Sequence, residues 1–274
     1  MQFLLRVKDL NVSYPGVGAR PHHAVENVSF EIGEGEVLGL MGESGCGKTS
    51  IALALLGLLS KDQAHVSGSI QFRGEELLSQ DRNSLRAIRG AGISLVFQEP
   101  ELALSPVMKI RDQIAEVIHA HNNWKWGRCR AEAELALARV GLTDSPRLFS
   151  AYPHQLSGGQ RQRVVLAQAL ACNPVLLIAD EPAASLDARS QRELLALLRE
   201  LQRELRISIL LISHAQEVQA SLADRLIVMA NGRIAEQGPF EQLYRNPSHP
   251  ITRTMLRTSA AAGVTENLDF EMVT

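Results

Sequence analysis

The stretch Gly42–Thr49, with the sequence GESGCGKT, constrains this 274-residue chain more than any other feature. A short apolar run typical of a buried strand precedes it at 36–41, and a long apolar run typical of a buried helix follows it at 50–59. The pattern G-x-x-x-x-G-K-[ST], the P-loop, requires this strand–loop–helix context. Its glycines let the backbone approach a phosphate closely, and successive N–H groups at the helix start attract the anion. The stretch therefore predicts a phosphate-binding loop; the structural alternative is a mere glycine turn before a helix.

Individual positions in this loop have separate expected roles. Lys48 is expected to reach the β- and γ-phosphates of a nucleotide, and the Thr49 hydroxyl is expected to bind Mg²⁺. Cys46 is interpreted as only a small residue in the loop, with oxidation-sensitive nucleotide binding as the sharper alternative. The expected nucleotide-binding residues are Gly42, Glu43, Ser44, Gly45, Cys46, Gly47, Lys48, Thr49 and Ser50.

Apolar runs separated by helical stretches predict a parallel α/β core. These runs lie at 37–41, 93–97, 175–179 and 207–212. Strands that alternate polar and apolar residues predict an antiparallel β subdomain near the N-terminus. They lie at 4–16, which we interpret as an edge strand, at 24–36 and at 68–77. The expected fold class is α/β, a P-loop NTPase core with an N-terminal antiparallel β subdomain and an inserted all-helical subdomain.

The inserted subdomain is expected over about 100–160, because the pattern there becomes helical. Apolar residues at helical spacing predict one helix at 106–121, where Pro106 favours a helix start, and another at 128–141. The insert interrupts what is otherwise one nucleotide-binding domain over residues 1–258.

Later segments complete the expected layout. Residues 190–205 predict an amphipathic helix with Ser190 as a candidate cap. Asn231-Gly232 predicts a β-hairpin within 225–238. The tail at 259–274 is expected to be loose.

Polar residues stand where the core strands end, which is where ligands gather in parallel sheets. Asp180 and Glu181 follow an apolar strand, as in a Walker-B arrangement, so Asp180 is expected to hold Mg²⁺ and Glu181 to polarise an attacking water. Gln98 is expected to coordinate Mg²⁺ and that water, and His214 to contact the γ-phosphate. The structural alternatives are two acids that satisfy a helix dipole and two polar strand ends without a ligand.

Composition excludes several other classes of protein. The net charge is −2, so no basic excess points to nucleic acid. Three scattered cysteines without a CxxC pair indicate neither a disulfide framework nor a zinc site, and favour a reduced, cytoplasmic compartment. We expect no secretory signal at the N-terminus and no membrane span, because no uncharged apolar stretch is long enough.

A second glycine motif, LSGGQ, lies at 156–160. Ser157, Gly158 and Gly159 predict another anion-binding turn, opening a helix from Gln160. One chain already has a phosphate-binding loop, so the economical explanation is that this turn contacts the γ-phosphate of ATP held by another copy.

With this motif the chain resembles the nucleotide-binding subunit of an ABC transporter over about residues 3–258. The motifs occur in the family's order, and LSGGQ upstream of the Walker-B strand is nearly diagnostic. The resemblance implies that Tyr14 stacks on adenine, that Ser157–Gln160 contact the ATP of a partner subunit, and that Asp187 belongs to the D-loop. Two departures, Ala215 where the family usually has Asp and Pro182-Ala183-Ala184 before the D-loop, put the tuning of inter-subunit coupling in doubt.

The segments at 104–118 and 244–256 resemble those of dipeptide, oligopeptide and nickel importer ATPases, although Ile251 replaces their usual aromatic residue. The resemblance implies ATP and Mg²⁺ as cofactors and ATP-driven pairing of two cassettes, the second being this chain or a paralogue. It also implies two transmembrane permease subunits, indirectly a substrate-binding protein, and a peripheral place on the cytoplasmic side of the inner membrane.

Two other functions compete with the importer reading. One is a soluble ABC ATPase that acts on nucleic acid or the ribosome; such chains typically have coiled-coil insertions or two cassettes, and basic surfaces. This chain has one cassette and a net charge of −2. The other is a catalytically dead regulatory cassette, against which Glu181 and His214 argue.

Overall fold

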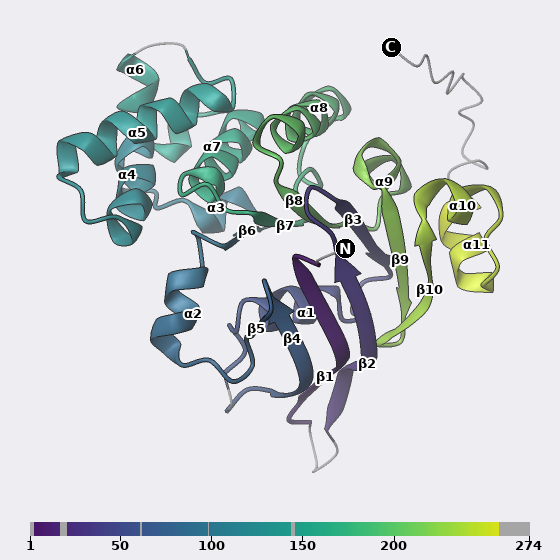
Figure 1. The fold of residues 1–274 in the computed structure, drawn as a ribbon. Helices are drawn as coiled ribbons and strands as arrows, with labels where there is room; N and C mark the ends of the chain where they lie inside the picture. Colours follow the sequence, from purple (N-terminus) through teal and green to yellow (C-terminus); the bar gives the residue numbers. More distant parts are fainter. Residues whose placement is uncertain (1–2, 17–20, 61, 98, 144–145, 258–274) are drawn as a thin grey trace.

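The structure, a computed structural model, describes residues 3–16, 21–60, 62–97, 99–143 and 146–257 (Figure 1). Many of the helices gather on one side of a central sheet, and a second sheet packs on the other side together with the helix that follows the glycine loop. This arrangement confirms the expected α/β class, with its antiparallel N-terminal part and its helical insert. Gln98 and the tail at 259–274 lie outside the described residues.

The central sheet has six strands in the order β10-β9-β3-β8-β7-β6. Their bounds are β3 Val37–Gly42, β6 Ile93–Val96, β7 Leu176–Asp180, β8 Ser208–Ile212, β9 Arg225–Ala230 and β10 Arg233–Pro239. β3, β7 and β8 are buried along their whole length, which explains why they read as continuous apolar runs. All four predicted core strands are confirmed, and β3 pairs in parallel with β8.

The hairpin around Asn231-Gly232 is also confirmed, since β9 and β10 are antiparallel and both turn residues have positive φ, 49° and 77°. The sequence did not reveal that β9 also pairs in parallel with β3. This pairing places Met229 opposite Gly42, beside the glycine loop.

The second sheet is antiparallel, in the order β2-β1-β4-β5. Its strands are β1 Leu5–Tyr14, β2 His22–Ile32, β4 His65–Phe72 and β5 Glu75–Glu76. The expectation that 4–16 forms an edge strand is wrong, because β1 lies between β2 and β4. Alternating burial shows that one face of a strand is covered, but it does not say how many neighbours the strand has.

The remaining elements are mostly helical. They are α1 Lys48–Leu55, α2 Arg82–Ile88, α3 Pro100–Ala103, α4 Ile110–His121, α5 Trp126–Arg139, α6 Pro146–Phe149, the short 3-10 turn Pro153–Gln155, α7 Gly158–Leu170, α8 Ala188–Leu205, α9 Gln216–Leu222, α10 Phe240–Arg245 and α11 Pro250–Arg257. Helices α3 to α6 lie between β6 and α7 in the chain, where the insert was expected. None of the helices in the described ranges combines the length and apolar character that a membrane crossing needs.

The expected helix start at Pro106 is wrong, because α4 begins at Ile110. The buried amide of Gln113 explains the difference. Its nitrogen donates to the carbonyls of Ser105 and Met108, at 3.0 and 2.9 Å, and its oxygen accepts from the Ser105 N–H. These bonds hold residues 105–108 as a turn. A helix that began at Pro106 would have to break this turn.

Two hydrophobic cores lie on opposite faces of the central sheet. Along β7, Leu177 and Ala179 face the helical side, whereas Leu176 and Ile178 face the antiparallel sheet and α1. The sheet is therefore the middle layer of the molecule, between the two cores.

Candidate functional site

The glycine loop joins the end of β3 to the start of α1 and has little room for side chains. Gly47 has φ 103°, and a Cβ there would lie 2.2 Å from the Ala24 carbonyl oxygen. A Cβ at Gly42 would lie 2.7 Å from the Met229 carbonyl oxygen. Both positions therefore require glycine, and the loop is tightly wrapped before the first helical residue, Lys48.

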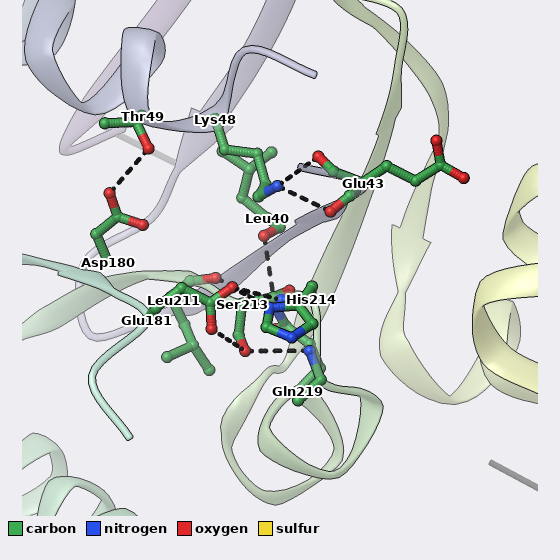
Figure 2. A network of polar contacts seen from close by, with 12 residues as sticks. Leu40, Glu43, Lys48, Thr49, Asp180, Glu181, Leu211, Ser213, His214 and Gln219 are labelled. Carbon is green, nitrogen blue, oxygen red and sulfur yellow. Dashed lines mark hydrogen bonds and ion pairs between the residues drawn. The ribbon is translucent and has the colours of Figure 1, made fainter. Parts of the chain in front are cut away.

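Lys48 is only 9% exposed, and its ammonium group turns back into its own loop. Nζ donates to the carbonyl oxygens of Gly42 and Glu43, both at 2.8 Å (Figure 2). The charge is thereby held at the concave side of the loop, where the P-loop pattern places phosphates.

Thr49 and Asp180 come from α1 and β7 and meet across the sheet edge (Figure 2). Thr49 Oγ1 donates to Asp180 Oδ2 at 3.1 Å. Burial raises the pKa of the Asp180 carboxyl, the Thr49 hydrogen bond and Lys48 oppose this shift, and the adjacent Glu181 adds to it. A hydroxyl and a carboxylate in contact are hard oxygen donors, so this pair fits Mg²⁺.

Glu181 follows Asp180 with a left-handed backbone, φ 48°, which is uncommon for a residue other than glycine. Three donors surround its carboxylate. The Ser213 hydroxyl donates at 3.0 Å, the His214 backbone N–H at 2.9 Å and His214 Nδ1 at 2.5 Å. Since a carboxylate only accepts, Nδ1 carries the proton in this contact. The Glu181 side chain is 11% exposed and the His214 ring 67%, so the ring faces the open side of the cluster.

These groups surround one pocket of about 720 Å³. It is large enough for a nucleotide-sized ligand. At one end the Tyr14 hydroxyl and Ser50 Oγ are 2.9 Å apart. The predicted residues that line the pocket are Tyr14, Gly42, Glu43, Ser44, Gly45, Gly47, Lys48, Thr49, Ser50, Asp180, Glu181 and His214.

Some lining residues carried no sequence signal. His22, Gln216, Glu217 and Met255 also face the pocket, from β2, α9 and α11. No motif marks them, because their approach depends on how distant elements pack around the loop.

Cys46 differs from the rest of the predicted loop set. It does not line the pocket but lies at a separate cavity of about 130 Å³ that Met229 and Met255 also line. Its Sγ is 3.8 Å from Lys48 Nζ, and its residue is 6% exposed. The position of the thiol fits the interpretation of a small buried residue in the loop.

The LSGGQ residues also lie outside the pocket lining. Ser157 caps α7: its Oγ accepts from the Gln160 N–H at 3.2 Å, and Gln160 Oε1 accepts from the Ser157 N–H at 3.0 Å. The helix therefore starts at Gly158, earlier than the expected start at Gln160. Added Cβ atoms would come no nearer than 3.9 Å at Gly158 and 3.7 Å at Gly159 to the described residues. Neither glycine is required by contacts within this chain.

Asp187 lies next to this turn, at the start of α8. Its Oδ1 accepts from the N–H groups of Arg189 and Ser190, both at 3.0 Å, and Ser190 Oγ donates to its Oδ2 at 2.7 Å. The expectation that Ser190 caps α8 is therefore wrong; Asp187 is the cap, and α8 begins at Ala188. Because Gly159 packs near Ser190, the glycine turn and the α8 cap form one surface.

A second cavity of about 810 Å³ adjoins the first and shares Thr49 and Asp180 with it. Leu58, Phe97 and Leu102 line it and are 43%, 45% and 83% exposed. The lining of this cavity is thus partly apolar and open to solvent. Arg89 forms part of the wall and donates to the carbonyls of Leu56 and Gly57, both at 2.7 Å, just beyond α1.

Comparison with known proteins agrees with this geometry. The family profile described as ABC transporter matches residues 25–184. Glutathione import ATP-binding protein GsiA of Salmonella typhimurium (strain LT2) is 41% identical over 92% of this chain, which spans 41% of that relative. Dipeptide transport ATP-binding protein DppD of Bacillus subtilis (strain 168) is 40% identical over 93% of this chain and 76% of its own length.

A solved structure is similar in fold as well. The dimeric, post-hydrolysis structure of the ATP-binding cassette MJ0796 bound to ADP and Pi superposes with a TM-score of 0.75 and 26% identity, over 86% of this chain and 98% of that one. The family profile covers more than half of the chain, and the loop, the Walker-B strand and the glycine turn occupy the positions described above. The chain belongs to the ABC transporter family.

Proposed function

We propose that this chain is the ATP-hydrolysing subunit that energises an ABC importer of peptide-type cargo. The observation that carries the proposal is the meeting of Thr49, Asp180 and the Glu181–His214 pair around one nucleotide-sized pocket at the glycine loop. Peptide-type cargo rests on the names of the glutathione and dipeptide relatives. The chain spans about two-fifths of the length of the glutathione import relatives. Their activity as complete proteins is therefore attributed to this chain only as part of this proposal.

ATP binding is assigned to the pocket as follows. Tyr14 stacks on adenine, and the loop residues from Gly42 to Ser50 hold the phosphates. Lys48 turns from its carbonyl partners to the β- and γ-phosphates, which are stronger acceptors because they are charged. Thr49 and Asp180, with Gln98, would hold Mg²⁺, which would neutralise phosphate charge when bound.

Hydrolysis is assigned to Glu181 and His214. The Glu181 carboxylate accepts a proton from the attacking water while the water oxygen bonds to the γ-phosphorus and the bond to ADP breaks. The exposed His214 ring is free on its outer side to contact the γ-phosphate. The Ser213 hydroxyl and the His214 backbone N–H hold the Glu181 carboxylate in place for this reaction.

A second cassette, self or paralogue, completes each site through Ser157–Gln160. Glycine in a helix is less stable than alanine by about 0.5–1 kcal/mol, and contacts within this chain do not require it at 158 or 159. Close approach of an outside group, the ATP of a facing subunit, explains both glycines. MJ0796, which is dimeric with ADP and Pi, supports the pairing.

Two permease subunits are the proposed membrane partners, with a substrate-binding protein acting through them. The second cavity, with exposed Leu58, Phe97 and Leu102, offers an apolar groove for a cytoplasmic segment of a permease. Residues 1–258 then act as one nucleotide-binding domain at the cytoplasmic face of the membrane, and the helical insert at 100–160 moves with the permease.

Glu181→Gln tests the catalytic assignment. The variant is expected to bind ATP normally but to hydrolyse it about a hundredfold or more slowly, because the amide cannot accept the water proton. Phosphate release, ATP affinity and ATP-dependent dimerisation in size-exclusion chromatography measure this. Glu204→Gln, an exposed acid-to-amide change on α8, is the control and should match the wild type. Wild-type turnover by Glu181→Gln removes Glu181 from this role.

Mild-detergent purification of the tagged chain from membranes tests the transport assignment. Two permease chains should accompany it, with or without a second cassette. Recovery of ribosomal or DNA-bound proteins without any membrane chain would leave the ATPase chemistry standing and overturn the importer.

A further inference from the structure

Gln219 on α9 is completely buried, and its amide contacts the segment that leads into His214 (Figure 2). Its amide nitrogen faces three backbone carbonyl oxygens. Nε2 lies 3.0 Å from the oxygen of Ser213, 3.3 Å from that of Leu211 and 3.5 Å from that of Leu40. The last two carbonyls belong to the neighbouring parallel strands β8 and β3, so one side chain joins two strand ends to the segment that follows them.

The surroundings determine which way this amide points. Three carbonyls require a donor, and the NH₂ group has two protons to share among them. Oε1 has no hydrogen-bond partner among the described residues. It occupies space that exists only because residue 39 is glycine, since a Cβ there would lie 2.2 Å from it. A buried acceptor without a donor disfavours the folded state, so stability alone does not account for a glutamine here.

The Ser213 carbonyl connects Gln219 to the reacting groups. It belongs to the same peptide unit as the His214 N–H, which donates to Glu181 Oε1 at 2.9 Å. A peptide unit is planar, and its C=O and N–H point in opposite directions. Gln219 therefore holds one end of this unit while Glu181 holds the other, so a rotation of the unit breaks both contacts.

The start of α9 offers little else to fix this segment. Its cap position is Ala215, which has no side-chain acceptor, and the Ala215 N–H donates to Ser213 Oγ at 3.2 Å. That same hydroxyl donates to Glu181 Oε2. Besides the His214 ring, which contacts Glu181, and the Ser213 N–H, which donates to the Leu40 carbonyl at 3.2 Å, the Ser213 and Gln219 side chains tie the beginning of α9 to the sheet and to Glu181.

We propose that Gln219 is a positioning residue for ATP hydrolysis: it orients the Ser213–His214 peptide and, through it, the Glu181 carboxylate and the His214 ring. The proposal rests on the roles assigned to Glu181 and His214 in the proposed function. It assigns no contact between Gln219 and ATP, so nucleotide affinity should not depend on the amide.

Gln219→Met tests this, because methionine has a similar length but cannot donate. The full-length variant should show kcat lowered about tenfold to a hundredfold, as expected when a reacting group is misplaced, with KM for ATP unchanged. Gln202→Met is the matched control. Gln202 is 9% exposed, and its amide donates at 2.6 Å to the Gly35 carbonyl, at the opposite end of β3. The Gln202→Met variant should lower the melting temperature about as much as Gln219→Met does, but its kcat should equal that of the wild type.

The outcomes are separable. If Gln219→Met has the wild-type kcat, or if Gln202→Met loses as much, the positioning role is overturned. Glu181→Gln measured alongside distinguishes the two proposals: if it is inactive while Gln219→Met is normal, only the positioning role fails, and if it is active, the catalytic assignment fails first. If Gln219→Met does not fold, kcat and KM of Gln219→Leu are measured instead and compared with those of Gln202→Met.

Discussion

At the residue scale, burial disfavours the ionised form of the Asp180 carboxyl, which is the form that the proposed Mg²⁺ would favour. The residue is 8% exposed, and burial raises the pKa of its carboxyl. Because the pKa is raised in the folded state, folding favours the protonated carboxyl. The contribution of this group to the free energy of unfolding is therefore fully present below pH 3.8, the ordinary pKa, and is lost as pH rises through the raised pKa of the folded state. At neutral pH the ionised carboxylate therefore destabilises the nucleotide-free fold, whereas a bound cation would favour that ionised form.

Asp180→Asn is expected to raise the melting temperature of the nucleotide-free protein at neutral pH and to abolish Mg²⁺-dependent hydrolysis. The amide retains an acceptor for Thr49 but removes the buried charge. The stabilisation should shrink as pH falls from neutral toward 3.8, because the buried wild-type carboxyl then takes up a proton and loses its charge. Thermal unfolding across this range, with phosphate-release assays, measures both effects.

Asp187→Asn provides the contrast. Hydrogen bonds from Ser190 hold the pKa of Asp187 below its ordinary value, so its ionised form stabilises the fold at neutral pH. Asparagine caps a helix about as well as aspartate, so this change should not raise the melting temperature. If Asp180→Asn lowers the melting temperature at neutral pH instead, the account of Asp180 is wrong.

At the element scale, the start of α7 combines a strong local cap with two glycines that the chain itself does not need. The cap comes from Ser157 and Gln160, which bond to each other's backbone N–H groups. A capped helix tolerates substitution in its first turn, so the proposed approach of a facing subunit can be tested at Gly158 and Gly159 without loss of the helix.

Gly159→Ala is therefore expected to keep or increase stability, by up to about 1 kcal/mol, while it lowers ATPase activity about tenfold or more. Denaturant unfolding and phosphate release measure the two quantities. Gly127→Ala is the matched control, because Gly127 is also the second residue of a helix, α5, with no described neighbour within 4 Å of an added Cβ. Full activity in Gly159→Ala would mean that no partner group approaches that position closely.

The elements also show what sequence can predict. The four core strands and the loop were predictable because their signals are local: a continuous apolar run, or a motif of fixed spacing. The central place of β1, the parallel pairing of β9 with β3 and the late start of α4 depend on contacts between distant segments. The contact of the buried Gln219 amide with Leu40 on β3 is of this kind, because the two residues lie far apart in the chain.

At the scale of the whole molecule, the two cavities meet at Thr49 and Asp180, so the nucleotide pocket and the apolar groove are neighbours. Arg89 links them further, since it lines the groove and bonds to the carbonyls just beyond α1, the helix that the glycine loop begins. The pocket and the groove therefore lie near the two ends of one short helix.

Leu102→Ser tests the groove. Leu102 is 83% exposed, so the change should leave stability and the ATPase activity of the isolated chain nearly unaltered. Copurification of the permease chains should decrease, because an apolar anchor of the groove is lost. Leu135→Ser, on the exposed face of α5 and outside the groove lining, is the control. Equal permease recovery with both variants would remove the groove as the contact surface.

The contacts of Lys48 with its own loop have a kinetic consequence. Two carbonyl oxygens already hold the ammonium, and Gly42 and Gly47 already have the backbone geometry that a tightly wrapped loop needs. When a phosphate enters, only the Lys48 side chain has to change its hydrogen-bond partners. The backbone of the loop does not have to be ordered first. Because ordering of the loop is avoided, nucleotide entry and exit are expected to be rapid compared with the rearrangement of whole subunits.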